Sequence, residues 1–125
     1  MLNKILWSFR ALLLKPFFKN IGHMTYIGKP LFLKGTKKIH IGNKVRIFPG
    51  SRLETHEGGS IKIADNCSIS QNVQITSAKE KLIIGKGTVI AANAFITNMS
   101  HDHSEVNKPI LEQRNNYAHT EIGEN

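Results

Sequence analysis

Several features that would place the chain in a common class of protein are missing from its sequence. The single cysteine excludes an internal disulfide bond. No apolar run is long enough to span a bilayer, and the apolar segment near the N-terminus lacks the small-residue cleavage site of a signal peptide. Aromatic residues are few and do not alternate with basic ones, so the net charge of +8 comes without a nucleic-acid-binding motif. We therefore expect one cytoplasmic domain that does not bind nucleic acid.

Medium-sized aliphatic residues recur at every sixth position over long stretches of the chain. Three triplets show this period: Ile41, Ile47 and Leu53; Ile63, Ile69 and Ile75; Ile84, Ile90 and Ile96. A weaker triplet precedes them: Ile21, Ile27 and Leu33. The fourth residue after the first two aliphatics of each strong triplet is small or narrow. A six-residue period fits neither an ordinary helix nor an ordinary strand, and it is typical of the parallel β-helix.

Triangular coiling explains the period. Three six-residue faces make one coil, the aliphatic of each face points inward, and small residues lie where the wall bends. One such bend position is Cys67, which we interpret as core packing and not as a nucleophile. The sequence predicts four coils with three inward ladders: Ile41/Ile63/Ile84, Ile47/Ile69/Ile90 and Leu53/Ile75/Ile96.

The breaks between triplets all predict insertions at one corner of the prism. The next aliphatic follows after ten residues at Ile63, after nine at Ile84 and after twenty-six at Ile122. The longest excursion occupies residues 97–119. Insertions on one face of a solenoid commonly form its binding face, so this corner is the expected site.

Residues 1–20 differ from the repeats, and we predict an amphipathic helix that ends before Pro16. One interpretation is a cap that covers the open edge of the first coil. The other is peripheral contact of residues 2–19 with the inner face of a membrane. In the second interpretation, four aromatic residues lie at the lipid headgroups: Trp7, Phe9, Phe17 and Phe18.

The long excursion carries a histidine–aspartate pair at His101 and Asp102, then a Lys-Pro-Ile step at 108–110, and the repeat resumes at Ile122. With the hexads, these motifs resemble the hexapeptide-repeat sugar O-acetyltransferases of capsule, lipopolysaccharide and exopolysaccharide synthesis. The resemblance covers residues 21–125, which we treat as one domain after the N-terminal segment. It implies an all-β fold, a single-stranded left-handed parallel β-helix, with a short α-helix before it.

The resemblance also implies a reaction, in which acetyl-CoA donates an acetyl group to a hydroxyl of a sugar or glycan, without a metal. The resemblance implies that the catalytic histidine of the family falls on His101. An imidazole with a near-neutral pKa suits this role, because it can take the hydroxyl proton. Supporting or substrate-binding roles are expected for four neighbours: Asn98, Asp102, His103 and Glu105. Members of the family are homotrimers with sites between neighbouring prisms. The resemblance places most of the acetyl-CoA site beyond Asn125.

Two alternatives stay open. The chain is either a truncated β-helix fragment without catalytic activity, or a zinc-dependent, carbonic anhydrase-like protein of the same fold. In the zinc alternative three histidines hold the metal: His101, His103 and His119. The other histidines are interpreted as outward polar positions without a partner: His23, His40 and His56.

Overall fold

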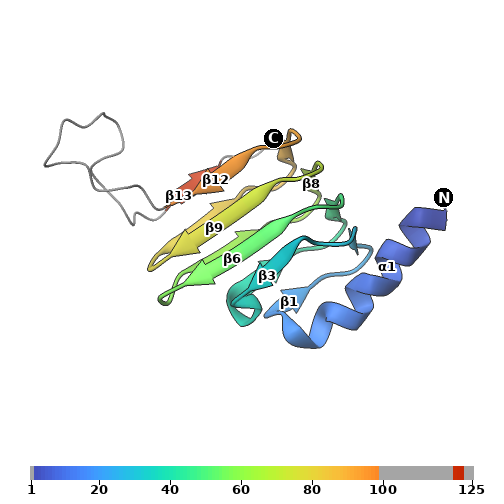
Figure 1. Cartoon of the computed structure of the whole chain (residues 1–125), viewed down its shortest axis with the longest axis horizontal. Coiled ribbons are helices and arrows are strands. Elements are labelled where there is room, and N and C mark those ends of the chain that lie inside the picture. Colours follow the sequence, from blue (N-terminus) through green and yellow to red (C-terminus); the bar gives the residue numbers. More distant parts are fainter. Residues whose placement is uncertain (1, 99–119, 123–125) are drawn as a thin grey trace, which may run out of the picture.

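A helix followed by stacked triangular coils makes up the structure, a computed structural model that describes residues 2–98 and 120–122 (Figure 1). The elements are α1 (Leu2–Leu14), the short 3₁₀ helices η1 (Lys15–Phe17) and η2 (Thr36–Lys38), and the strands β1 (Asn20–Ile21), β2 (Tyr26–Ile27), β3 (Phe32–Lys34), β4 (Ile39–Ile41), β5 (Arg46–Ile47), β6 (Arg52–His56), β7 (Ser60–Ile63), β8 (Ser68–Ile69), β9 (Gln74–Ala78), β10 (Lys81–Ile84), β11 (Val89–Ile90), β12 (Phe95–Thr97) and β13 (Thr120–Ile122).

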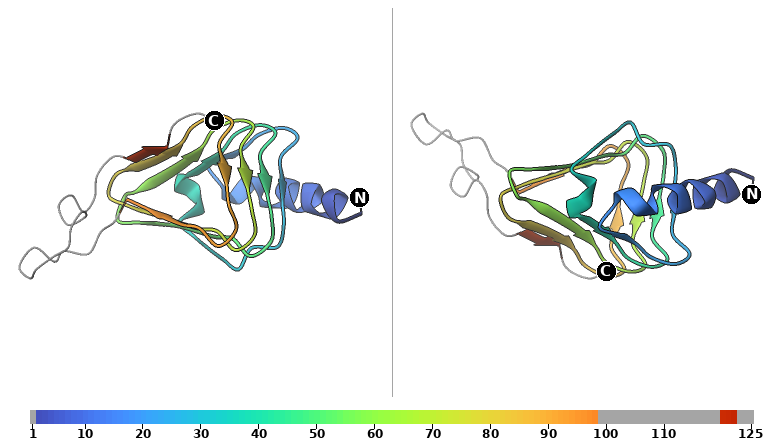
Figure 2. Two further views of the ribbon diagram at one scale, coloured as in Figure 1. Left: turned by 90° about the horizontal axis from the view of Figure 1, so that it is seen from above. Right: turned by 90° about the horizontal axis from the view of Figure 1, so that it is seen from below.

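All strand pairs are parallel, and the strands form three sheets that are the three faces of a prism (Figure 2). Sheet A has the order β1-β4-β7-β10-β13, sheet B has β2-β5-β8-β11, and sheet C has β3-β6-β9-β12. Each coil therefore contributes one strand to each sheet. Four coils are complete before β13 joins sheet A, which confirms the predicted β-helix and its four coils.

The inward ladders are those predicted. Ile41 pairs with Ile63 and Ile63 with Ile84 in sheet A, and the equivalent aliphatics pair in sheets B and C. The weaker first triplet continues the same ladders, since its members pair with the first strong triplet. Most of these side chains are fully buried, and each such burial contributes about 1.5–3 kcal/mol.

Narrow side chains fill the bends of the wall. Val45, Cys67 and Val73 are completely buried, and Thr88 is nearly so. Burial raises the pKa of the Cys67 thiol, so this residue is an inert part of the core, as predicted. The turn between sheets A and B requires left-handed backbone in successive coils, at Lys44, Asn66 and Gly87. The bends thus stack on one another in the same way as the ladders.

Gly42 packs directly against the next coil, and this contact leads to a prediction. A Cβ atom at this position would overlap Asp65 Oδ1 and lie 2.9 Å from the Asp65 backbone nitrogen. The same carboxylate oxygen accepts a 2.8 Å hydrogen bond from the backbone of Asn43, so it is not free to move. We expect Gly42→Ala to lower the free energy of unfolding by about 1–3 kcal/mol in urea denaturation. The matched variant Ser70→Ala should stay near wild type, and equal stability of the two variants would contradict the tight contact.

Helix α1 lies across the N-terminal end of the stack (Figures 1 and 2). Its Ala11 is buried, its Leu14 packs against the core, and Phe18 beyond it belongs to the core. The Arg10 guanidinium donates a 3.2 Å hydrogen bond to the Ile27 carbonyl in β2. The helix therefore covers part of the first coil.

The aromatic residues of the N-terminal segment divide between two faces. Trp7 packs against Tyr26 and Phe48, with ring centroids 5.6 and 5.5 Å apart. Because Phe18 is buried in the core, its predicted placement at lipid headgroups is wrong. Phe9 and Phe17 are exposed. No helix in the described residues has the length and apolar character to cross a membrane.

Candidate functional site

The corner between sheets C and A carries the insertions, as predicted from the spacing. The chain passes this corner between β6 and β7, between β9 and β10, and between β12 and β13. Four of the five predicted site residues lie outside the described residues: His101, Asp102, His103 and Glu105. Their roles stay predictions. Asn98, where the long excursion departs, is described and buried.

Asn98 directly follows β12 in the fourth coil, and its side chain forms hydrogen bonds to the third coil. Its Oδ1 accepts a 2.9 Å hydrogen bond from the backbone N–H of Ala78. Its Nδ2 donates to Ser77 Oγ at 3.0 Å and to the Glu80 carbonyl at 3.2 Å. The carboxamide thus uses both of its N–H donors and one acceptor lone pair. Its supporting or substrate-binding role stays a prediction, and in the described structure Asn98 anchors the base of the excursion.

This anchoring can be tested by substitution. Asn98→Ala removes three hydrogen bonds and leaves the buried N–H of Ala78 without an acceptor. We expect a loss of about 1–3 kcal/mol in the free energy of unfolding, measured by urea denaturation. The control is Gln71→Ala, at an exposed residue of the turn between β8 and β9, and it should change stability little. An Asn98→Ala protein as stable as the control would show that the anchor is dispensable.

A carboxylate–imidazole pair lies at the same corner in the second coil, two coils before Asn98. Glu54 Oε1 and His56 Nε2 are 3.1 Å apart on the outer face of β6. His56 is in register with Ala78, the residue that Asn98 holds in the next coil. Glu54 is nearly buried, whereas the His56 side chain is 30% exposed. In the tautomer in which Nε2–H donates a hydrogen bond to Glu54, Nδ1 of the neutral ring keeps its lone pair and can act as a base.

Arg52 completes this network from the same strand. Its guanidinium lies 3.4 Å from Glu54 Oε2 and stacks on the ring of Phe32 at 5.1 Å. The expectation that His56 has no partner is therefore wrong. Alternation along a strand puts residues i and i+2 on one face, so the spacing of Arg52, Glu54 and His56 carried the signal that would have revealed the network.

A cationic groove of about 300 Å³ runs along the outer face of sheet A. Its polar lining is basic apart from Ser60: Lys19, Lys38, His40, Lys62 and Lys81. Burial lowers the pKa of His40, and the nearby charges of Lys62 and Lys19 lower it further. Several cations that converge on one groove favour an anionic group such as a phosphate. The six-residue spacing does not show that these residues converge on one groove.

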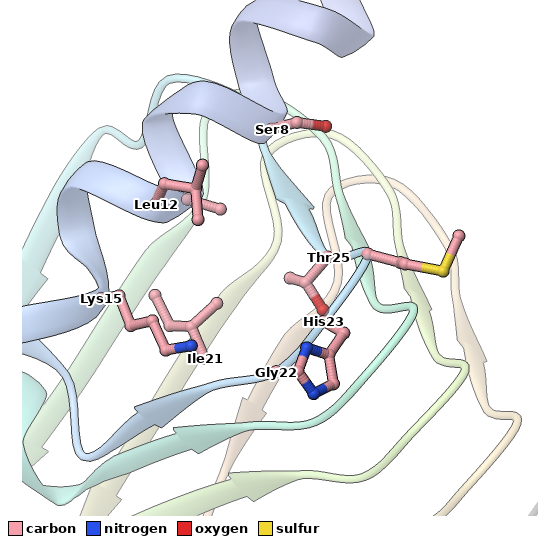
Figure 3. A pocket seen from close by; sticks show the side chains of 9 residues that line it. Ser8, Leu12, Lys15, Ile21, Gly22, His23 and Thr25 are labelled. Carbon is pink, nitrogen blue, oxygen red and sulfur yellow. The ribbon is translucent and has the colours of Figure 1, made fainter.

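A second hollow, of about 370 Å³, lies between α1 and the turn that follows β1 (Figure 3). The hollow is lined by Ser8 and Leu12 of α1 and by Lys15 of η1, and the turn contributes His23. Within the described ranges, no group of three or more histidine, cysteine, aspartate or glutamate residues could hold a metal ion. The histidines of the zinc alternative fall in the undescribed part, so that alternative stays a hypothesis.

Comparison with known proteins adds a relative. The chain is 28% identical over 100 residues to an Escherichia coli (strain K12) protein provisionally named the lipopolysaccharide biosynthesis O-acetyl transferase WbbJ. The match covers 80% of this chain and 49% of that protein, so the chain spans about half the length of its relative. No protein-family model and no solved structure matches the chain. The parallel β-solenoid and this match together confirm that the chain resembles the hexapeptide-repeat sugar O-acetyltransferases.

Proposed function

We propose that the protein transfers an acetyl group from acetyl-CoA to a sugar hydroxyl during the synthesis of a cell-surface polysaccharide such as lipopolysaccharide. The name of the relative supports the class of reaction, acetyl transfer to oxygen. The identity of acetyl-CoA as the donor and of a glycan as the acceptor belongs to the proposal alone.

The observation that carries this proposal is the corner between sheets C and A. A rigid wall of stacked coils ends there at Asn98, whose hydrogen bonds hold the point where the histidine-bearing excursion departs. Catalytic groups are commonly carried on loops that a rigid scaffold positions. The pair of Glu54 and His56 lies at the same corner and offers polar contacts for a hydroxylated acceptor.

In the proposed reaction, His101 takes the proton of the sugar hydroxyl as the oxygen attacks the thioester carbonyl carbon. The tetrahedral intermediate then expels the CoA thiolate by breaking the carbon–sulfur bond, and the imidazolium of His101 returns the proton to sulfur. Asp102 or Glu105 accepts a hydrogen bond from the other ring nitrogen and so sets the tautomer. His103 contacts the sugar.

Two further parts of the proposal concern partners. The protein acts as a homotrimer, in which the site of one prism faces a coil of its neighbour. The cationic groove on sheet A receives phosphate groups of the donor or the acceptor, because several lysines converge on it.

The test is an acetyl-transfer assay on the complete protein. Purified protein is incubated with acetyl-CoA and saccharide acceptors, the released CoA thiol is measured, and the saccharide is analysed by mass spectrometry. We expect thiol release that depends on the acceptor, together with the mass of one acetyl group on the sugar. Thiol release at the same rate without acceptor, or no acetylated sugar across a panel of surface saccharides, would refute the proposal.

A further inference from the structure

The outward face of α1 is apolar. Five large side chains on it are 53–65% exposed: Ile5, Leu6, Phe9, Leu12 and Leu13. The opposite face of the same helix holds Trp7, Ala11 and Leu14 against the first coil. A helix that only caps a solenoid would carry polar residues on its solvent side. An apolar face of this kind indicates a surface that contacts something else.

The charge around this face has one sign. The first 53 residues contain eleven lysines and arginines and no aspartate or glutamate, and the first acidic residue is Glu54 in the second coil. Lys4, Lys15 and Lys19 are exposed on and just after the helix. Lys37 lies beside them, because its ammonium donates a 2.7 Å hydrogen bond to the Pro16 carbonyl. The N-terminal end of the prism is thus an apolar strip among cations.

We propose that the outward face of α1 docks on the surface of a bilayer that contains anionic lipid. The apolar side chains enter the interface, and the surrounding cations lie beside the lipid phosphates. The prism then stands on the membrane by its N-terminal end, with the fourth coil roughly 15 Å above the first at the usual strand spacing.

Charge complementarity selects lipid over a second copy of the chain. Two copies joined through this face would bring two acid-free, cationic ends together, and like charges across an interface are unfavourable. An anionic bilayer supplies both the apolar phase and the counter-charge. The hollow beside the helix fits the same partner, because Lys15 and His23 line it next to the apolar Leu12 (Figure 3).

Vesicle co-sedimentation of the full chain tests the proposal. The vesicles are pure phosphatidylcholine, or phosphatidylcholine in which part of the lipid is replaced by phosphatidylglycerol. We expect binding that is much stronger with phosphatidylglycerol than with phosphatidylcholine alone and that weakens as salt is added. The double variant Phe9→Gln/Leu13→Gln should bind at least about tenfold more weakly. The matched control Val89→Gln/Phe95→Gln removes two equally exposed apolar side chains from β11 and β12, far along the stack, and should bind as wild type.

A single substitution tests how much the cations contribute to vesicle binding. Lys15→Gln should weaken binding to anionic vesicles about fivefold and leave the weak association with neutral vesicles unchanged. Because Lys15 is exposed, its thermal unfolding should match that of wild type. An equal loss on both kinds of vesicle would mean that the lysine does not face anionic lipid.

A fluorescence probe reports which face touches the lipid. Trp7 is the only tryptophan, so Phe9→Trp in a Trp7→Phe background places the sole indole on the outward face. Its emission should shift to shorter wavelength with anionic vesicles, whereas Phe95→Trp in the same background should not respond. Two outcomes would overturn the proposal: no vesicle binding by the wild type, or a lipid-free oligomer that dissociates to monomers on Phe9→Gln/Leu13→Gln. The second outcome would identify the face as a contact between copies.

Discussion

Replacing Ile69 by aspartate should unfold the solenoid or lower its free energy of unfolding by about 4 kcal/mol or more. Ile69 is fully buried in the middle of the sheet B ladder, between Ile47 and Ile90. Within residues 2–98 the core around Ile69 consists of hydrophobic side chains of all three ladders, so a carboxylate there would have no cation to pair with. Because each coil is stabilised only by its neighbours, a disrupted central coil weakens the stack on both sides.

Urea denaturation followed by circular dichroism measures this effect. Ile69→Ala gives the cavity part alone, which should be about 2–5 kcal/mol. Val89→Asp is the matched control, because Val89 lies on the outer face of the same sheet and is 73% exposed. A well-folded Ile69→Asp protein with the stability of Val89→Asp would mean that the ladder does not form the core.

Replacing His101 by alanine should lower the proposed acetyl transfer by about two to four orders of magnitude, the range for loss of a general base. The neutral imidazole would be the group that accepts the hydroxyl proton, and alanine offers no substitute. The circular dichroism spectrum and the unfolding midpoint should be those of the wild type. The rate is measured by CoA thiol release in the complete protein, at saturating acetyl-CoA.

Two other imidazoles provide the comparison. His103→Ala should reduce the rate much less, and His56→Ala should act mainly on the KM for the acceptor because its ring is already paired with Glu54. A larger loss of kcat with His103→Ala or His56→Ala than with His101→Ala would reassign the base. Restoration by zinc of the activity of a chelator-treated sample would favour the metal-dependent alternative.

The amino-acid sequence by itself determined the solenoid. A six-residue period of aliphatics is a local pattern, and stacked triangular coils are the arrangement that buries all three ladders at once. The same spacing located the insertion corner, because any departure from six shows which face has lengthened. It also showed Cys67 as part of the wall, since a narrow side chain is needed where the chain bends.

Only the tertiary structure decided which side chains meet across coils and which faces of α1 are covered. Asn98 reaches Ser77 and Ala78, which are about one coil earlier in the chain, and no local pattern shows such a contact. The Glu54–His56 pair depended on both side chains lying on the outer face of β6. Helix α1 is apolar nearly all round, so its sequence alone left cap and membrane contact as alternatives. Packing against the first coil covers one face and leaves the other exposed, because a single coil end can bury only one side of a helix.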